Sequence, residues 1–363
     1  MNSKKSATES RIGIVTIWDT NNYGNRLQNY ALQTILEKLA RSVETIPDDL
    51  PHSLRYWKSL LGFWTRACGT SKNQKSRVAR RIVFSHFSGK MIHKTPEIFD
   101  CLSFLLRFRH YDAYIVGSDQ VWNPRFGHLH PVDLLRPFKT GVRVAYAASF
   151  GADDLEFSEV QEAADHLRGF DALSVRETSG KELLEQLTGR ADIEVLVDPT
   201  LLLTAEEWRQ IAQKPCKVPH RFVLCYFLGD VPTSRKQEID ALAGRMNCEI
   251  VDLTDPASQA YVSGPSEFLW YAAHAELVCT DSFHGCVFAI LNGIPLRRYP
   301  REEVLFPMES RMQTLEEKLG LCGEDNGTCT VYSDYHNVAT RLEIERARSF
   351  AFLKNALGME QDS

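Results

Sequence analysis

The sequence lacks the segments that would place it in or across a membrane. Its apolar runs, such as Phe222–Leu228, have the length of a strand and are far shorter than the roughly 20 residues that span a bilayer. Ser6–Arg11 is polar, and the apolar run Ile12–Trp18 that follows is too short for a signal sequence. We therefore expect a soluble, cytoplasmic protein.

Cysteine pairs and common catalytic motifs are also missing. The nine cysteines are odd in number, and no two of them form a CxxC pair. This pattern predicts a reducing compartment, no disulfide framework and no structural zinc. There is no Walker sequence, no HExxH, no GxSxG and no GxGxxG after a strand, so the sites that these motifs build are not expected.

The net charge is mildly negative, but it is unevenly distributed. The 363 residues include 42 Lys and Arg and 47 Asp and Glu, a formal charge of −5. Residues 52–110 hold twelve Lys and Arg and only two acids, Glu97 and Asp100, so this segment carries +10 and the remainder −15. A nucleic-acid-binding domain is usually basic throughout, so no nucleic-acid partner is expected.

The basic segment 52–110 interrupts the first domain and predicts a helical insertion rich in aromatic residues. One interpretation is an amphipathic surface that makes peripheral contact with anionic lipid at the inner membrane face. The other is a set of helices that pack their aromatic rings inward and leave Lys and Arg in water. The sequence leaves both open.

Short β-branched runs alternate with helical patterns along the whole chain, which predicts parallel sheets covered by helices. The polar segment Gln213–His220, with Pro215 and Pro219, is the expected linker. We therefore expect an α/β protein of two Rossmann-like domains facing a cleft. In this scheme residues 1–212 form the first, acceptor-side domain. Residues 213–363 form the donor-side domain, and its last helix packs back on the first domain.

Ligands of open parallel sheets bind beyond the carboxyl ends of the strands, so the loops there hold the candidate site residues. The first loop leads into a helix at Asn25–Leu39, whose N-terminus can hold an anion. Gly24 allows close approach of the backbone, and Arg26 adds a positive charge. Asn22 or Asn25 as a simple helix cap is the alternative.

The second loop follows the expected strand Ala113–Val116. Ser118 and Asp119 are candidates to contact a sugar, with Asp119 as a possible base. Trp122 either stacks on a sugar ring or belongs to the core, and Asn123 is a candidate contact that also fits an ordinary turn.

Two further loops contain the residues best suited to anion binding and proton transfer. Arg176 follows the expected strand Ala172–Val175, where its guanidinium either grips an anion or forms a salt bridge within the domain. The other loop precedes a helix and places His284 in its first turn as an acid–base candidate. Its remaining candidates are Asp281, Ser282, Phe283 and Gly285, with Asp281 or Ser282 as the helix cap.

These runs, taken together, resemble the polysaccharide pyruvyl transferase family. The resemblance extends in the same order from Ile12 to Leu321 and rests on six segments: Asn22–Gln33, Val116–Pro124, Ala145–Gly151, Ser174–Glu177, Asp198–Thr200 and Thr280–Gly285. It implies a GT-B-like fold. It also implies transfer of the enolpyruvyl group of phosphoenolpyruvate to two hydroxyls of one sugar, forming a pyruvate ketal in polysaccharide, exopolysaccharide or other bacterial cell-surface glycan synthesis. Arg176 and His284 would contact phosphoenolpyruvate, because they stand at matching positions.

The expected scheme uses phosphoenolpyruvate as donor substrate, a free or lipid-linked saccharide as acceptor, and no cofactor or metal. His284 transfers protons, Arg176 and the N–H groups near Ser282–Gly285 hold the anion, and Asp119 or Asp281 activates the acceptor hydroxyl. One alternative is a nucleotide-sugar glycosyltransferase, for which Asp252 and Asp255 are candidate ribose contacts. The other is a non-catalytic saccharide-binding protein.

Overall fold

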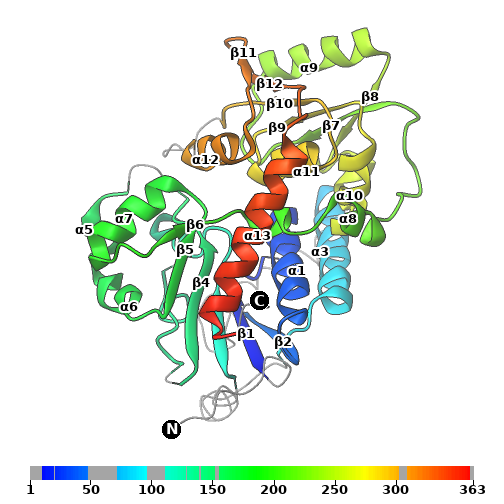
Figure 1. Cartoon of the computed structure of the whole chain (residues 1–363). Helices are drawn as coiled ribbons and strands as arrows, with labels where there is room; N and C mark the ends of the chain where they lie inside the picture. The colour runs from blue at the N-terminus through cyan, green and yellow to red at the C-terminus, as the bar shows by residue number, and fades with distance from the viewer. Residues whose placement is uncertain are drawn as a thin grey trace.

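Two six-stranded sheets form the frame of the molecule (Figure 1). The computed structural model describes residues 10–19, 21–47, 72–95, 111–127, 129–138, 140–151, 155–301 and 309–359. The first sheet has the order β2-β1-β3-β4-β5-β6, and all of its neighbouring strands are parallel. Its strands are β1 (Arg11–Thr16), β2 (Ser42–Pro47), β3 (Ala113–Val116), β4 (Val142–Ala148), β5 (Ala172–Val175) and β6 (Glu194–Val195).

The second sheet has the order β11-β12-β10-β9-β7-β8. Strands β8, β7, β9 and β10 are parallel, whereas β12 and β11 add an antiparallel edge. Its strands are β7 (Phe222–Tyr226), β8 (Glu249–Asp252), β9 (Leu277–Thr280), β10 (Leu296–Arg298), β11 (Glu324–Asp325) and β12 (Thr330–Tyr332). The predicted α/β class with two Rossmann-like, GT-B-like units is confirmed.

Both faces of the first sheet are buried, as the apolar composition of its strands requires. Successive strand residues point to opposite faces, and they join different apolar clusters: Ile14 and Ile115 pack in one, Val15 and Val116 in the other. Helices α1 (Tyr23–Glu37) and α7 (Thr178–Thr188) contribute Leu27 and Leu184 to these two clusters. The other described helices of the chain are α3 (Lys72–Met91), α5 (Phe157–Val160), α6 (Ala164–Arg168), α8 (Ala205–Ile211), α9 (Thr233–Met246), α10 (Pro265–His274), α11 (Phe283–Leu291), α12 (Ser310–Leu319) and α13 (Val338–Ala356). Short 3-10 turns are η3 (Pro124–Phe126), η4 (Gln161–Ala163), η5 (Pro199–Leu201) and η6 (Gln259–Val262).

Helix α13 runs from the second sheet back along the first (Figure 1). Phe352 packs near Tyr146 of β4, with ring centroids 6.3 Å apart. Arg346 donates hydrogen bonds to the carbonyl oxygens of Leu201 and Leu203 at 2.8 and 2.9 Å. The strands of the first sheet all precede residue 212 and those of the second all follow it. The exact boundary at 212 stays a prediction.

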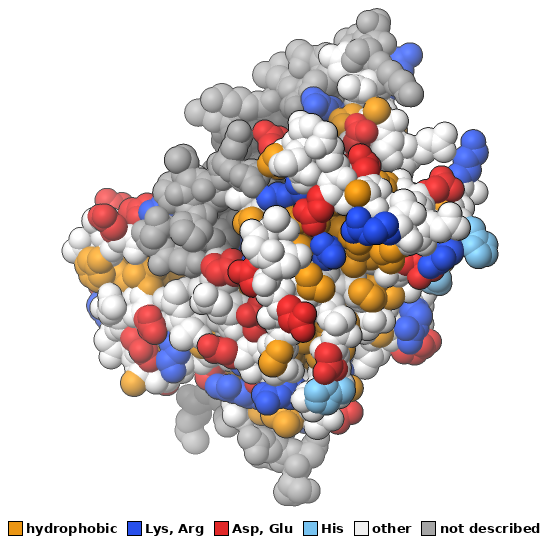
Figure 2. Space-filling model, turned by 90° about the horizontal axis from the view of Figure 1, so that it is seen from above, with side chains coloured by type: hydrophobic (Ala, Val, Ile, Leu, Met, Phe, Trp, Pro, Cys, Tyr) orange, Lys and Arg blue, Asp and Glu red, His pale blue; other side chains and the backbone are white. Residues whose placement is uncertain are grey.

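The described part of the basic insertion contains α3. Phe84 and Phe87 of this helix are buried in the core, and so is the side chain of Arg80. This arrangement corresponds to the interpretation in which the aromatic rings pack inward. Residues 52–71 and 96–110 lie outside the described part. Across the described residues, no helix is both long and apolar enough to cross a membrane, and acidic and basic side chains are interspersed on the face shown in Figure 2.

Candidate active site

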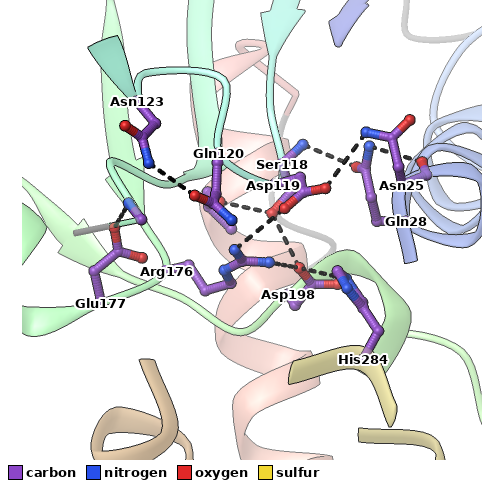
Figure 3. Close-up of polar contacts among 12 residues, drawn as sticks. Asn25, Gln28, Ser118, Asp119, Gln120, Asn123, Arg176, Glu177, Asp198 and His284 are labelled. Carbon is purple, nitrogen blue, oxygen red and sulfur yellow. Dashed lines mark hydrogen bonds and ion pairs between the residues drawn. The ribbon is translucent and has the colours of Figure 1, made fainter. Parts of the chain in front are cut away.

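The candidate residues gather at the carboxyl ends of strands in both sheets. In each sheet the strand order reverses beside its first strand, between β1 and β3 and between β7 and β9. Such switch points are where open α/β sheets bind ligands. Asn25 lies in the first turn of α1, which follows β1, and Asp119 lies in the loop after β3. His284 lies in the first turn of α11, which follows β9 (Figure 3). The site therefore combines both units.

Asp198 is the carboxylate at the centre of the site (Figure 3). Its side chain is fully buried, and Oδ2 lies 2.6 Å from Nη1 of Arg176 and 3.5 Å from Nε2 of His284. Ser118 Oγ donates to the same oxygen at 3.2 Å. Thr200 donates its backbone N–H and its hydroxyl to the other oxygen. Asp198 thus fixes Arg176 and His284 relative to each other.

Asp119 lies on the other side of Arg176. Its Oδ1 is 3.6 Å from Nη2 of Arg176, and its Oδ2 accepts a hydrogen bond from Asn25 at 3.4 Å. The Asp119 backbone has φ of 57°, in the left-handed region that Asp tolerates better than most residues. Gln28 supports the neighbouring loop, because its side-chain oxygen accepts the backbone N–H of Ser118 at 2.9 Å.

His284 packs directly against α1. A Cβ built on Gly24 would lie 2.0 Å from Nδ1 of His284, so only glycine fits there. The sequence predicted that Gly24 lets a ligand approach the backbone. In the structure the imidazole of His284, from the other unit, occupies that position. The ring therefore has Asp198 at Nε2 and the first turn of α1 near Nδ1.

Asp281 has a different place from the one the sequence suggested. Its buried carboxylate accepts the backbone N–H groups of Leu228 and Gly229 at 2.7 and 2.8 Å, and Arg301 lies 3.4 Å from Oδ2. These contacts fix the loop after β7, so we assign Asp281 to loop positioning instead of acceptor activation. Ser282 caps α11 through the N–H of Gly285 at 3.4 Å.

Phe283 contacts two guanidinium groups. The guanidinium carbon of Arg176 lies 4.6 Å from its ring centroid, and that of Arg311 lies 5.9 Å away. Gly285, two residues on, is packed against Thr280, whose Oγ1 would be 2.5 Å from an added Cβ. Phe283 and Gly285 thus shape the start of α11.

Two candidate residues, Arg26 in the first turn of α1 and Trp122 after β3, have structural partners that replace the substrate contacts expected of them. Arg26 is fully buried, donates to Ile17 and Asn25, and lies over the ring of Trp18 at 4.1 Å. Trp122 is fully buried and donates its indole N–H to the backbone oxygen of Asp133. It therefore belongs to the core, the second of the two interpretations that the sequence allowed. We retain neither Arg26 nor Trp122 as a substrate contact.

Two asparagines act as local caps. Asn22 accepts the N–H of Asn25 at the start of α1, at 3.2 Å. Asn123 accepts the N–H of Arg125 and donates to Gln120, so it shapes the turn after β3. These are the turn and cap alternatives that the sequence left open.

Sequence reasoning gave no role to Asp198, Glu177 or Arg311. Asp198 stood inside a recognised motif, and that was the available signal. Glu177 is buried and accepts the N–H of Phe150 at 2.8 Å, which holds the loop after β4. Arg311 is buried at the start of α12, beyond the last of the recognised motifs.

The buried charges shift one another's pKa values. Burial favours the neutral form of Asp119, but the charges of Arg176 and His284 outweigh it and lower its pKa. For Asp198, burial is again outweighed, by His284 first and then Arg176, and its pKa is strongly lowered. Burial raises the pKa of Glu177. Burial and the nearby Arg176 lower the pKa of Arg311 to about 10.

The site holds buried donors that the described residues leave unused. Arg176 is 3% exposed, and its Nε and Nη2 have no hydrogen-bond partner within the described part of the chain. Nε2 of His284 likewise has none, and Oδ2 of Asp198 lies 3.5 Å from it. Buried unpaired donors are costly, and an anionic ligand would satisfy them. Arg176 therefore forms the salt bridges that the sequence allowed, from Nη1 to Asp198 and from Nη2 to Asp119, while Nε and Nη2 still lack a hydrogen bond within the described residues.

Fold and site together define a two-unit α/β protein of GT-B type, with a buried arginine–histidine–carboxylate site between the carboxyl edges of its sheets. The family model for polysaccharide pyruvyl transferase matches residues 22–299, and the chain belongs to that family. This confirms the resemblance seen in the sequence.

Solved structures similar to this chain include two epimerases. UDP-N-acetylglucosamine 2-epimerase from Rickettsia bellii has 9% identity and a TM-score of 0.48, covering 96% of this chain and 97% of its own. UDP-GlcNAc 2-epimerase from Methanocaldococcus jannaschii has 12% identity and a TM-score of 0.42, covering 94% of this chain and 99% of its own. No curated protein matches the chain significantly.

Proposed function

We propose that this protein transfers the enolpyruvyl group of phosphoenolpyruvate to two hydroxyls of one sugar residue, forming a pyruvate ketal and inorganic phosphate. The observation that carries the proposal is the pair of unused, buried donors on Arg176, next to His284 and the start of α11. A small substrate with two or three negative charges would satisfy these donors better than a neutral sugar alone. Membership in the polysaccharide pyruvyl transferase family supports it.

The reaction needs an acid, a base and an anion site. Protonation of C3 turns the CH2 group into CH3 and makes C2 electrophilic. One sugar hydroxyl then adds to C2, the bond from C2 to the phosphate oxygen breaks, and the second hydroxyl closes the ketal. The two hydroxyl protons balance the one gained by C3 and the one taken by phosphate.

The described residues divide these tasks. Arg176 binds the carboxylate or phosphate through its unused Nε and Nη2. His284 delivers the proton to C3, and Asp198 keeps its imidazole oriented. Asp119, whose lowered pKa keeps it ionised near neutral pH, accepts the proton of the acceptor hydroxyl. The positive end of α11 stabilises the departing phosphate.

The glycosyltransferase alternative receives no comparable support. Asp252 Oδ1 accepts from the backbone and hydroxyl of Thr254 and from the N–H of Asp255. Asp255 accepts the N–H of Ala257. Both carboxylates therefore shape their own turns.

A thermal-shift titration tests the donor. Phosphoenolpyruvate at about 100 times its Kd should stabilise the protein by about 2.7 kcal/mol, whereas UDP-sugars should not raise Tm. Arg176→Lys keeps the positive charge but loses the two-pronged guanidinium. The rise in Tm with phosphoenolpyruvate should therefore be much smaller in this variant. Arg125→Lys is the matched control, because Arg125 pairs with Glu159 through Nε and Nη2 away from the site. Stabilisation by UDP-sugars alone would reject the proposed donor.

A further inference from the structure

Arg80 of the basic insertion has hydrogen-bond partners in both units. It lies on α3 and is 3% exposed. Toward the loop after β1, its Nε donates to the side-chain oxygen of Asn21 at 2.6 Å and its Nη2 to the backbone oxygen at 3.3 Å. Its Nη1 donates to the hydroxyl of Tyr23 at 2.9 Å.

The same guanidinium reaches the second unit. Nη1 also donates to the carbonyl oxygens of Leu253 and Tyr261, at 3.1 and 2.6 Å. The rings of Tyr23, Phe84 and Tyr261 surround the charge at 4.6 to 5.0 Å. Three segments that are distant in sequence therefore meet on one side chain: the insertion, the loop before α1, and the segment between β8 and α10.

Tyr23 extends this junction. Its hydroxyl donates to the carbonyl oxygen of Ser263 at 2.8 Å, and its ring stacks on Phe268 of α10 at 4.5 Å. Burial raises the pKa of this phenol to about 12, so it keeps its proton and its donor role. The first turn of α1 is thus fixed to the second unit from two directions.

The residue after Tyr23 is Gly24, which contacts the imidazole of His284. An added Cβ there would lie 2.0 Å from Nδ1, so the space between α1 and the ring is smaller than a methyl group. A small displacement of residues 21–23 therefore moves the surface against which His284 rests. Arg80 holds those residues directly.

We propose that Arg80 is a positioning residue for His284. Acting through Asn21, Tyr23 and Gly24, it sets the placement of the imidazole in the site. The kinetic part of this inference rests on the proposed pyruvyl transfer, whereas the placement of the ring does not. The basic insertion thereby takes part in building the site as well as in covering the first sheet.

The test begins without substrate, by NMR of the His284 imidazole, with its signal assigned from His284→Gln. Arg80→Met and the milder Asn21→Ala should both shift this signal. Arg346→Met is the matched control, since Arg346 also binds carbonyl oxygens across the two units but does not contact residues 21–24. It should lower Tm and leave the His284 signal in place. Asn21 is exposed, so Asn21→Ala should not disturb folding. This variant therefore still tests the inference if Arg80→Met folds poorly.

The kinetic readout uses phosphate release from phosphoenolpyruvate with an acceptor. For Arg80→Met, kcat should fall about 10-fold to 100-fold while KM for phosphoenolpyruvate stays within about 2-fold. Arg80→Lys should recover part of the loss. An unchanged His284 signal in folded Arg80→Met, or a kcat loss no larger than that of Arg346→Met, would overturn the inference. A shifted signal with no turnover in the unmodified protein would instead reject the proposed function and keep the positioning role.

Discussion

At the level of single residues, one glycine and one carboxylate determine how the site is assembled. Gly24 gives the imidazole of His284 its place, and Asp198 holds His284 and Arg176 together. The sequence pointed to Arg176, His284 and Asp119, because each follows a strand and carries a group suited to anion or proton chemistry. It gave no role to Asp198, because an Asp-Pro pair also breaks a strand without any ligand. It gave Arg26 and Trp122 as candidate substrate contacts, but Arg26 is buried in the first turn of α1 and Trp122 in the core. The burial of one polar side chain at a helix start, or of one ring in a loop, leaves no periodic signal.

The Gly24 contact predicts a large effect from one methyl group. Gly24→Ala should lower kcat about 100-fold, because the new Cβ would displace the imidazole by an ångström or more. Gly244→Ala, in the interior of α9 where an added Cβ meets nothing within 4 Å, is the control. It should keep full activity and gain about 0.5–1 kcal/mol of stability. Equal activity of the two variants, measured by phosphate release, would contradict a role for the close contact between Gly24 and His284.

Asp198 predicts a particular dependence of stability on pH. Asp198→Asn should cost about 3–5 kcal/mol near pH 7, because the buried guanidinium of Arg176 loses its anionic partner at 2.6 Å. The folded pKa of Asp198 lies below the unfolded value of about 3.9, so its contribution is present above that pH and lost as the pH falls further. The difference in unfolding free energy between the unmodified protein and Asp198→Asn, measured in urea, should therefore be smaller at pH 3 than at pH 7. A constant difference would contradict the lowered pKa.

At the level of elements, the site arises where strand order reverses in both sheets. The sequence indicated most of this, since α1 has an apolar face of helical period and β3 and β7 are short apolar runs. Strand β2 was not predicted, because Ser42–Pro47 is a half-polar edge strand. Strand β6, at the opposite edge of the same sheet, has only two residues. Such edge strands depend on their neighbour more than on their own pattern.

The loop after β7 should depend on Asp281. Asp281→Asn weakens two backbone hydrogen bonds to a buried carboxylate, so we expect a loss of about 2 kcal/mol and faster amide exchange at Leu228 and Gly229. Asp255→Asn is the control, because Asp255 accepts one backbone N–H at an exposed turn. Hydrogen exchange followed by mass spectrometry measures both. Unchanged exchange at residues 228–229 would leave Asp281 free for another role.

At the level of the whole molecule, contacts distant in sequence join the two sheets. Arg80 reaches partners between 57 and 181 positions away, and α13 returns from the second sheet to the first. Alternating strands and helices predicted two units, but periodicity within a segment carries no information about which segments meet. The orientation of the units and the Arg80 junction were therefore beyond the sequence.

The return of α13 can be tested with two side chains of the same helix. Phe352→Ala empties a buried position near Tyr146 and should cost about 3–5 kcal/mol in urea unfolding. Ile344→Ala changes a side chain that is 63% exposed and should alter stability by less than about 0.5 kcal/mol. Similar losses in the two variants would argue against packing of α13 on the first sheet.

The most direct measurement of the proposed pyruvyl transfer is mass spectrometry of a saccharide panel, lipid-linked acceptors included, after incubation with phosphoenolpyruvate. We expect one acceptor to gain the mass of pyruvic acid less one water, with one phosphate released for each product. His284→Gln and Arg176→Met, if folded, should form almost none. Unimpaired product formation by both variants, or products that carry a sugar from a UDP-sugar and no pyruvyl group, would contradict the proposed chemistry.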